Sequence, residues 1–488
     1  MVEAVAADHP VFGKAAALIG DAWLTSGSCG ALIHRNPSTG EVLGEFPAGG
    51  EIEADTAIAA ALAAFPVWRD LAPAARRDIL LRAAALIREK SAELAAIASH
   101  ETGSVYNPAG PAGAAEHLVY YAGWIDKVLG ETTPFSSAIL NYTRHEPYGV
   151  VLALTSWNGP VTSALMKLGP ALAAGNCVII KPPELGPFAT IRLAEIFLEA
   201  GLPAGVLNVV TGGPDLGARL VADPRIGKIS FTGGLPTARH VLRGAAQNAT
   251  PVVTELGGKS ANIVFADADL DRAAGMASTM GCMVHSGQGC LFPTRLLVED
   301  KIYDPLVERV MANVAKARVG NPFEAGVTSG PVINEAAVER ITGYVDRARS
   351  ESHGKLLTGG ERLGGALAQG YFLAPTVFGD VDNKSPLAQE EIFGPVLSIV
   401  RFSDEAAAIG LANDTNYGLA GYVHTRDFGR AHRVAAALEA GYIGINGFPP
   451  MPVQAPFGGY KQSGSGREGG REGILEFLRL KNIYAYLN

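Results

Sequence analysis

The spacing of hydrophobic positions changes along the chain near residue 149. Residues 52–104 carry apolar side chains at helical spacing, with Arg and Glu on the opposite face, and residues 110–130 continue in the same way. Both segments predict helices. Beyond residue 149, short β-branched runs alternate with helical stretches, a rhythm that is typical of a parallel α/β sheet.

The chain after residue 149 divides into two α/β halves of similar style. In the first half, the expected strands are 149–155, 177–181, 206–211, 228–232 and 252–255. The helices between them are expected around 161–174, 188–200, 214–222 and 236–247. In the second half, 262–460, the expected strands are 294–298, 396–402, 420–424 and 442–446. The predicted fold class is therefore α/β, with two Rossmann-like parallel-sheet domains.

Two segments outside these halves predict exposed strands. Ile139–His145 alternates apolar and polar residues and ends at the break Pro147–Gly149, which predicts a β-hairpin within 131–148. Ile483–Leu487 predicts a short strand at the end of the sequence. Because exposed edge strands pair with other chains, we expect a small β-arm that joins subunits into a homodimer or homotetramer.

The composition excludes several classes of protein. Of the 488 residues, 48% are hydrophobic and 18% are charged, the net charge is −8, and Lys and Arg never form a run of more than two. A nucleic-acid-binding surface normally needs a basic stripe, so no nucleic-acid partner is expected. No apolar run approaches the roughly 18 residues of a membrane span, and Met1–Pro10 has no signal-peptide pattern. We therefore expect a cytoplasmic protein without a membrane partner.

The chain contains Cys29, Cys177, Cys282 and Cys290, and none of them forms a CxxC pair. Neither a disulfide framework nor a metal site is expected. Gly287–Cys290 places the last cysteine after a Gly-containing turn, where a thiolate could be an accessible nucleophile. The alternative is a buried small hydrophobic residue, which this tetrapeptide alone favours. The other three cysteines are expected to be structural.

Two further clusters follow predicted strands. Glu255–Ser260 places a carboxylate at the C-terminal end of a strand, where parallel sheets bind ligands, and a surface Glu is an equally good interpretation. Ser156–Pro160 contains Asn158, whose amide could stabilise an oxyanion. By itself, that Asn is better explained as a helix N-cap.

Two more clusters carry groups that suit a nucleotide. Lys181 and Glu184 lie on a Pro-stiffened strand exit and could hold the vicinal hydroxyls of a ribose, or form an exposed ion pair. Phe231–Gly234 runs from a strand into a helix N-terminus, where free N–H groups and the helix dipole favour phosphate. This segment lacks the G-x-G-x-x-G spacing of a Rossmann fingerprint, so by itself the signal is weak.

Taken together and in order, these blocks resemble the aldehyde dehydrogenase superfamily. The resemblance covers the chain from about residue 15 to residue 488 and also rests on Glu391–Pro395, Asn416–Leu419 and Pro456–Gly464. The spacing from Glu255 to Cys290, 290 − 255 = 35 residues, is close to the family's usual spacing.

The resemblance implies a covalent mechanism. Cys290 would attack the aldehyde carbon as a thiolate, and the Asn158 amide and the Cys290 backbone N–H would hold the oxyanion. Hydride transfer to a nicotinamide would leave a thioester, and Glu255 would act as general base on the water that hydrolyses it. Lys167 and Lys259 would add positive potential.

The resemblance also implies an NAD site. Glu391 and Phe393 match the family's contacts to the nicotinamide ribose, and Lys181 and Glu184 match its contacts to the adenosine ribose. A 2′-phosphate about 4 Å from the Glu184 carboxylate would be repelled by roughly 1 to 4 kcal/mol, so NAD is expected rather than NADP. The full set of expected cofactor contacts is Thr155, Ser156, Trp157, Lys181, Glu184, Gly213, Gly217, Phe231, Thr232, Gly233, Gly234, Leu256, Gly257, Glu391 and Phe393.

Departures from the family pattern predict a wide substrate tunnel. Gly159 replaces a common aromatic residue beside the catalytic Asn, and Ser163 and Met166 stand where many members carry bulkier side chains. We expect the substrate to be a bulky, largely apolar aldehyde, aromatic or terpenoid. The expected substrate-lining residues are Gly159, Ser163, Met166, Gly289, Leu291, Met451 and Phe457.

The resemblance divides the chain into functional parts. Residues 1–124 and 148–257 would form the NAD-binding domain, residues 258–460 the catalytic domain, and residues 125–147 and 475–488 the oligomerisation arm.

Three other functions fit parts of the same pattern. A Cys-dependent thioesterase or acyltransferase would need Cys290 but no nicotinamide site. A CoA-acylating dehydrogenase would replace water by CoA, whereas the presence of Glu255 favours hydrolysis. An inactive NAD-binding member would need none of the proposed catalytic residues. His285, five residues before Cys290, is expected in a helix and turned away from the thiol rather than in a Cys–His pair.

Overall fold

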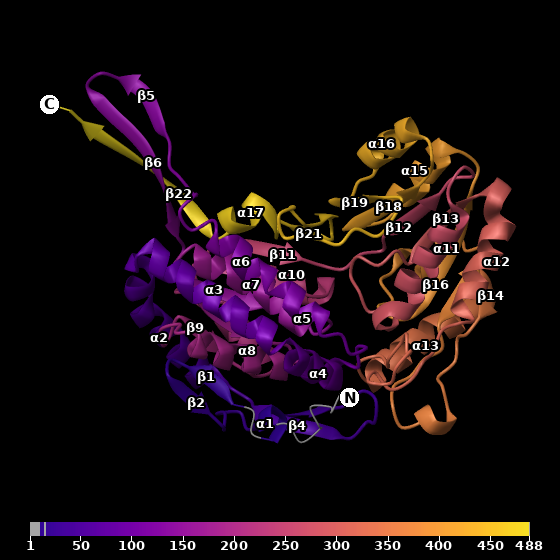
Figure 1. The fold of residues 1–488 in the computed structure, drawn as a ribbon, viewed down its shortest axis with the longest axis horizontal. Coiled ribbons are helices and arrows are strands. Elements are labelled where there is room, and N and C mark those ends of the chain that lie inside the picture. Colours follow the sequence, from indigo (N-terminus) through magenta and orange to yellow (C-terminus); the bar gives the residue numbers. More distant parts are fainter. Residues whose placement is uncertain (1–9, 14–15, 488) are drawn as a thin grey trace.

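The structure, a computed structural model, describes residues 10–13 and 16–487. Residues 1–9, for which no signal peptide is expected, lie outside the described part. Figure 1 shows two α/β lobes side by side and a narrow three-stranded sheet that projects from the first lobe. The predicted α/β fold class, with two largely parallel sheets and a small arm, is confirmed. No helix of the described residues is long and apolar enough to cross a membrane.

The first lobe is built on an eight-stranded sheet with the order β2-β1-β9-β8-β7-β10-β11-β21. The neighbours from β9 to β11 are parallel, whereas β1 and β21 run antiparallel to their neighbours β9 and β11. The expected strands of the first half are all present, and β1 and β2 were not predicted. The strands are β1 Ala17–Ile19, β2 Ala22–Leu24, β7 Val150–Leu154, β8 Cys177–Lys181, β9 Leu207–Val209, β10 Lys228–Thr232, β11 Val252–Glu255 and β21 Gly464–Ser465.

Helices pack on this sheet, and a small hairpin of β3 Ala31–Arg35 and β4 Val42–Pro47 lies beside it. The helices are α1 Pro10–Gly13, α2 Glu51–Asp70, α3 Pro73–Glu89, α4 Ser91–Thr102, α5 Ala109–Ala114, α6 Glu116–Ala122, α7 Pro160–Ala173, α8 Phe188–Glu199, α9 Pro214–Val221, α10 Leu235–Ala246 and α17 Gly470–Leu475.

The helix predicted over 110–130 is wrong beyond Ala122. The chain continues there as turns, from which Trp124, Ile125 and Val128 pack on the hydrophobic core. These apolar side chains have helical spacing in the sequence, but they reach the core from a series of turns.

The second lobe contains a seven-stranded sheet with the order β14-β15-β16-β13-β12-β18-β19, in which only β14 is antiparallel to its neighbour. Its strands are β12 Ala261–Val264, β13 Arg295–Glu299, β14 Lys355–Thr358, β15 Thr376–Gly379, β16 Val396–Phe402, β18 Ala420–His424 and β19 Tyr442–Ile445. Its helices are α11 Leu270–Ser278, α12 Tyr303–Val314, α13 Glu335–Ser350, α14 Pro386–Gln389, α15 Glu405–Asn413 and α16 Phe428–Ala437. The short strands β17 Tyr417–Gly418 and β20 Tyr460–Lys461 pair with each other.

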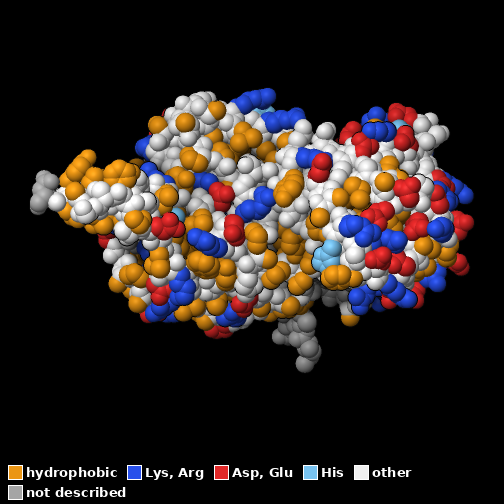
Figure 2. Space-filling model, turned by 90° about the horizontal axis from the view of Figure 1, so that it is seen from above, with side chains coloured by type: hydrophobic (Ala, Val, Ile, Leu, Met, Phe, Trp, Pro, Cys, Tyr) orange, Lys and Arg blue, Asp and Glu red, His pale blue; other side chains and the backbone are white. Residues whose placement is uncertain are grey.

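The arm consists of β5 Thr132–Ser136, β6 Ile139–Pro147 and β22 Leu478–Tyr486. The strand predicted at 483–487 begins earlier, at Leu478, and pairs with β6 along its length. In Figure 2 the projecting arm carries many hydrophobic side chains on its surface. Phe135, Tyr484 and Tyr486 are among the exposed large hydrophobic residues of the described chain.

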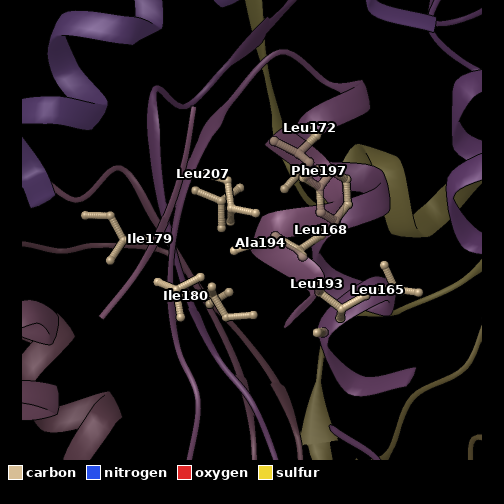
Figure 3. Packing of buried hydrophobic residues seen from close by; sticks show 14 of the residues in the cluster. Leu165, Leu168, Leu172, Ile179, Ile180, Leu193, Ala194, Phe197 and Leu207 are labelled. Carbon is tan, nitrogen blue, oxygen red and sulfur yellow. The ribbon is translucent and has the colours of Figure 1, made fainter. Parts of the chain in front are cut away.

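The core of the first lobe fixes the strands that carry the site. Figure 3 shows side chains of α7 and α8 packed together and against the strands β8 and β9. The labelled residues are Leu165, Leu168, Leu172, Ile179, Ile180, Leu193, Ala194, Phe197 and Leu207, all with 2% exposure or less. Such dense packing fixes the position of the C-terminal end of β8 relative to the neighbouring strands.

Candidate active site

The parallel register aligns four strand ends at one edge of the first sheet. Leu154 at the end of β7 lies opposite Lys181 on one side and Phe231 on the other. Thr232 at the end of β10 lies opposite Glu255 at the end of β11. The segments that follow these strands, which are the clusters noted in the sequence, therefore leave the sheet together at the edge where parallel sheets bind ligands.

A cavity of about 1190 Å³ lies along this edge, and Cys290 and Glu255 are part of its wall. Gly213, before α9, is not among its lining residues, although Pro214 and Asp215 are. The remaining predicted cofactor contacts all line it: Thr155, Ser156, Trp157, Lys181, Glu184, Gly217, Phe231, Thr232, Gly233, Gly234, Leu256, Gly257, Glu391 and Phe393. The cavity thus brings the predicted cofactor contacts together with two reactive side chains, Cys290 and Glu255.

The N-terminus of α10 opens into this cavity. Gly234 is the N-cap residue and lines the cavity with Thr237, and no side chain caps the helix. The first N–H groups of an uncapped helix have no intrahelical acceptor and carry a partial positive charge. A Cβ on Gly234 would meet only Pro236 Cδ, at 3.7 Å, so the backbone here is open to a ligand.

Lys181 and Glu184 form an ion pair in the wall of the cavity. Lys181 Nζ lies 3.0 Å from Glu184 Oε1, and the side chains are 8% and 40% exposed, respectively. The predicted alternative of an ion pair is thus present, and the carboxylate remains accessible to a second partner.

Glu391 is held against the glycines that follow β11. The Gly258 N–H donates a hydrogen bond of 3.0 Å to Glu391 Oε1, and a Cβ on Gly257 would collide with the same carboxylate. Burial raises the pKa of Glu391 to about 7, while the Gly258 N–H and Lys259 favour its charged form. Nearby, the rings of Trp157 and Phe393 meet edge to face, with centroids 5.5 Å apart.

The Cys290 loop is fixed from three sides. Gly287 has a φ of +70°, and a Cβ there would collide with the Gly394 carbonyl oxygen. A Cβ on Gly258 would lie 2.5 Å from the Cys290 carbonyl oxygen. From the first lobe, Asn158 Nδ2 donates a hydrogen bond of 3.0 Å to the Gln288 carbonyl oxygen.

These contacts leave Cys290 half-buried and leave one Asn158 N–H without a partner among the described residues. Burial raises the pKa of the Cys290 thiol to about 12, and the negative charges of Glu391 and Glu255 contribute in the same direction. The thiol therefore needs a base before it can act as a nucleophile at neutral pH.

Glu255 is a suitable base, because it is only 4% exposed and no side chain donates a hydrogen bond to its oxygens. Burial raises the pKa of Glu255 well above its usual value, and the charge of Glu468 adds to this effect. Lys167 and Arg467 act in the opposite direction. A buried carboxyl group with raised proton affinity is typical of general acid–base catalysis.

Glu468 was missed by the sequence analysis. Its Oε1 lies 2.7 Å from Lys167 Nζ, which also donates a hydrogen bond of 3.0 Å to Ser230 Oγ, and both charged side chains are buried. The only signal in the sequence was its position just after the block Pro456–Gly464. Lys167 was predicted to add positive potential, and its charge is paired with Glu468.

Lys259 was also predicted to add positive potential. It is 2% exposed, and its Nζ has no hydrogen-bond partner. Burial lowers the pKa of Lys259 to about 7, and the nearby Arg295 contributes to the decrease. At neutral pH this residue therefore carries only part of a positive charge.

A second cavity, of about 490 Å³, meets the first at Asn158, which lines both. Gly159, one of the predicted substrate contacts, lines the second cavity. Its other walls come from 95–111, 160–162, 284–285 and Thr328. The remaining predicted substrate contacts, Ser163, Met166, Gly289, Leu291, Met451 and Phe457, are not among the lining residues of these two cavities.

The helix predicted at His285 is wrong. His285 lies in a tight turn with a φ of 47°, not in regular helix, and this residue is exposed along the wall of the second cavity. No charge or hydrogen bond of His285 acts on the Cys290 thiol. Of the three cysteines expected to be structural, Cys177 and Cys282 are buried and Cys29 is exposed.

The sequence matches the model of the aldehyde dehydrogenase family over residues 23–483. The fold is similar to a betaine aldehyde dehydrogenase from Staphylococcus aureus solved in complex with NAD+ (36% identity, TM-score 0.95, 97% of this chain and 95% of that chain). It is also similar to HpcC from Thermus thermophilus (40% identity, TM-score 0.94, 97% and 93%). An aldehyde dehydrogenase from Bacillus cereus is equally similar in fold (36% identity, TM-score 0.94, 97% and 96%).

Proposed function

This chain belongs to the aldehyde dehydrogenase family, and we propose that it oxidises an aldehyde to its carboxylic acid through a thioester on Cys290, with NAD as the hydride acceptor. The observation that carries this proposal is that Cys290, Glu255 and Asn158 line one cavity, and that Asn158 also lines the second cavity. One cavity suits a dinucleotide and the other suits the aldehyde.

The residues of the first cavity fit NAD. Two polar groups that suit riboses, the Lys181–Glu184 pair and the Glu391 carboxylate, line the same cavity as Cys290. The uncapped N-terminus of α10 also opens into it and suits a pyrophosphate. Gly257 leaves space for the Glu391 carboxylate that a Cβ would fill. The Staphylococcus aureus relative was crystallised with NAD+.

The first step is activation of the thiol. Glu255 takes the proton of Cys290, and the thiolate attacks the aldehyde carbon to form a thiohemiacetal. The free N–H of Asn158 Nδ2 and the Cys290 backbone N–H hold the oxyanion, and removal of one such donor costs roughly 2.7 to 4 kcal/mol in comparable sites. The thiohemiacetal then loses a hydride from its former aldehyde carbon, which leaves a thioester on Cys290; bound NAD would supply the nicotinamide ring that accepts this hydride.

The second step is hydrolysis of the thioester. Glu255 first releases the Cys290 proton to solvent. It then removes a proton from water, whose oxygen attacks the acyl carbon, and Cys290 leaves as a thiolate. Lys167 and Glu468 adjust the proton affinity of Glu255 with charges of opposite sign. Because Glu255 supplies a base for water, we favour hydrolysis over transfer of the acyl group to CoA.

Glu184 supports a preference for NAD over NADP. Its carboxylate is accessible in the cavity, where it would accept hydrogen bonds from ribose hydroxyls and repel a 2′-phosphate. Lys181 at 3.0 Å moderates this repulsion but leaves the pair without net positive charge for a phosphate.

The size of the second cavity supports a bulky aldehyde, for which we propose the aromatic or terpenoid class. Its volume of about 490 Å³ is within the range of roughly 300 to 1,000 Å³ that is usual for small-molecule sites. Gly159 contributes to this space because it carries no side chain, and a Cβ there would meet only Thr162 Cβ, at 4.0 Å.

The remaining proposals concern assembly and location. We assign residues 1–124 and 148–257 to cofactor binding, residues 258–460 to the catalytic loop and its sheet, and residues 125–147 and 475–488 to an arm that forms a homodimer or homotetramer. Exposed Phe135, Tyr484 and Tyr486 on the arm support its burial against another subunit. The four free cysteines support a reducing, cytoplasmic location.

The test is NADH formation by the purified protein with aliphatic, aromatic and terpenoid aldehydes, with and without CoA. Wild type should turn over without CoA, Cys290→Ala should form no NADH, and Glu255→Gln should give a single burst because its thioester is not hydrolysed. NAD binding without NADH formation from any aldehyde would instead indicate an inactive binding protein. An absolute requirement for CoA would indicate an acylating enzyme.

A further inference from the structure

The second cavity contains no ionic group that could recognise a charged substrate tail. Among the described residues that line it, there is no Asp, Glu, Lys or Arg, and Tyr106 and His285 are its only aromatic residues. Quaternary ammonium groups are normally held by several aromatic rings, and carboxylates by Arg or Lys. The part of the substrate that extends away from Asn158 is therefore neutral.

The same wall nevertheless carries polar side chains among its apolar ones. Ser104, Asn107, Thr162 and Thr328 line the cavity together with His285. Covering such groups with a pure hydrocarbon would remove their water without replacing its hydrogen bonds, which is unfavourable. A substrate that carries its own hydrogen-bonding group suits this wall better than a terpenoid chain does.

His285 is the polar residue of this wall that lies closest in sequence to the nucleophile. Its φ of 47° turns the backbone in the left-handed region, where His is more common than most residues. Its ring stacks on Phe292, with centroids 6.4 Å apart and an interplanar angle of 28°. Phe292 is buried, so it supports one face of the imidazole.

His285 is exposed, and its imidazole has no hydrogen-bond partner among the residues that the structure describes. The side chain is exposed, yet surrounding protein desolvates it and lowers its pKa, and no charge or hydrogen bond opposes this shift. This combination is expected for a side chain on the wall of a deep cavity. A neutral imidazole offers one donor and one acceptor nitrogen, so it can bond a hydroxyl group in either direction.

We infer that the substrate is a neutral aromatic aldehyde bearing a ring hydroxyl group, and that His285 recognises this hydroxyl. This inference rests on the proposed aldehyde oxidation and narrows its substrate class. The carbonyl group lies at Asn158, where the cavities join, and the ring extends into the second cavity. There the aromatic surfaces of Tyr106 and His285 and the polar wall match a flat ring with one polar substituent.

The experiment compares kcat/KM for 3-hydroxybenzaldehyde and 4-hydroxybenzaldehyde with kcat/KM for benzaldehyde, citral and hexanal. Wild type should prefer at least one hydroxylated ring over benzaldehyde by about five- to tenfold, as expected for one hydrogen bond. In His285→Phe, which keeps a ring but removes both nitrogens, this ratio should fall to about one, mainly through KM. His285→Asn, which tolerates the same backbone conformation, should restore part of it.

His432→Phe, an exposed substitution on α16, is the matched control and should leave the ratio at the wild-type value. The inference would be overturned if the ratio of kcat/KM for the hydroxylated ring to that for benzaldehyde were unchanged in His285→Phe, or if the wild type preferred citral or benzaldehyde. In both cases NADH formation would still support the dehydrogenase function. If no aldehyde, hexanal included, gives NADH, the proposed function itself fails. Thermal unfolding of each variant shows whether a loss reflects folding, and His285→Asn keeps the test valid if His285→Phe is unstable.

Discussion

Gly258 packs directly against the main chain of Cys290: a Cβ on Gly258 would lie 2.5 Å from the Cys290 carbonyl oxygen. The segment that follows β11 therefore fixes the position of Cys290 in the wall of the cofactor cavity. The same segment donates the Gly258 N–H to Glu391, so one backbone stretch positions both sides of the site.

Gly258→Ala should displace the Cys290 loop and lower kcat by about a hundredfold, because errors near 1 Å in a reacting geometry have effects of this size. Steady-state kinetics with saturating NAD and aldehyde measures the loss. Gly275→Ala in α11 is the matched control, since a Cβ there meets nothing within 4 Å. Wild-type kcat in Gly258→Ala would show that the loop can shift without consequence.

Glu468→Gln should move the rising limb of the pH–rate profile to lower pH. Glu255 must be deprotonated to act as a base, and the negative charge of Glu468 is one cause, after burial, of its raised pKa. Removing that charge lowers the pKa of Glu255, so activity appears at a lower pH than in wild type.

The measurement is kcat against pH for both proteins. Glu439→Gln, which removes an exposed carboxylate elsewhere on the surface, is the control and should leave the profile in place. A shift of Glu468→Gln toward higher pH would contradict the assignment. Because Lys167 loses its buried partner, thermal unfolding should also show a lower Tm.

Gly159→Phe should narrow the second cavity and change substrate preference. Relative to acetaldehyde, kcat/KM for benzaldehyde should fall by at least about tenfold, since steric exclusion from a pocket readily produces such ratios. A Cβ on Gly159 meets only Thr162 Cβ, at 4.0 Å, so the variant should fold, and its Tm checks this. Equal losses for both aldehydes would show that Gly159 does not limit the size of the substrate.

Glu184→Ser should relax cofactor choice. Removing the carboxylate leaves Lys181 free to face a 2′-phosphate, so kcat/KM for NADP should rise about tenfold relative to NAD. Glu184→Asp retains the charge and should keep the wild-type preference for NAD. Wild type that uses both cofactors equally well would rule out a role for Glu184 in selection.

The sequence by itself determined the strand ends and the groups placed on them. Strands such as 228–232 and 252–255 were predicted at the bounds they have, because the alternation of β-branched runs and amphipathic helices is a local property of the chain. Parallel pairing then requires their C-terminal ends to meet. For this reason the predicted cofactor contacts of the first lobe, apart from Gly213, line a single cavity, and Glu391 and Phe393 reach the same cavity from the second lobe.

Only the tertiary structure decided which distant side chains meet. The Lys167–Glu468 pair joins residues 301 positions apart, and the wall with Tyr106 and His285 combines four separate segments. The spacing of Trp124 and Ile125 in the sequence predicts a helix, whereas the tertiary structure places both residues in turns against the core. The periodicity of the sequence indicates which face of a helix or strand is buried. Contacts across the fold depend on packing and loop geometry, which no local pattern specifies, and these contacts set the pKa values of the site.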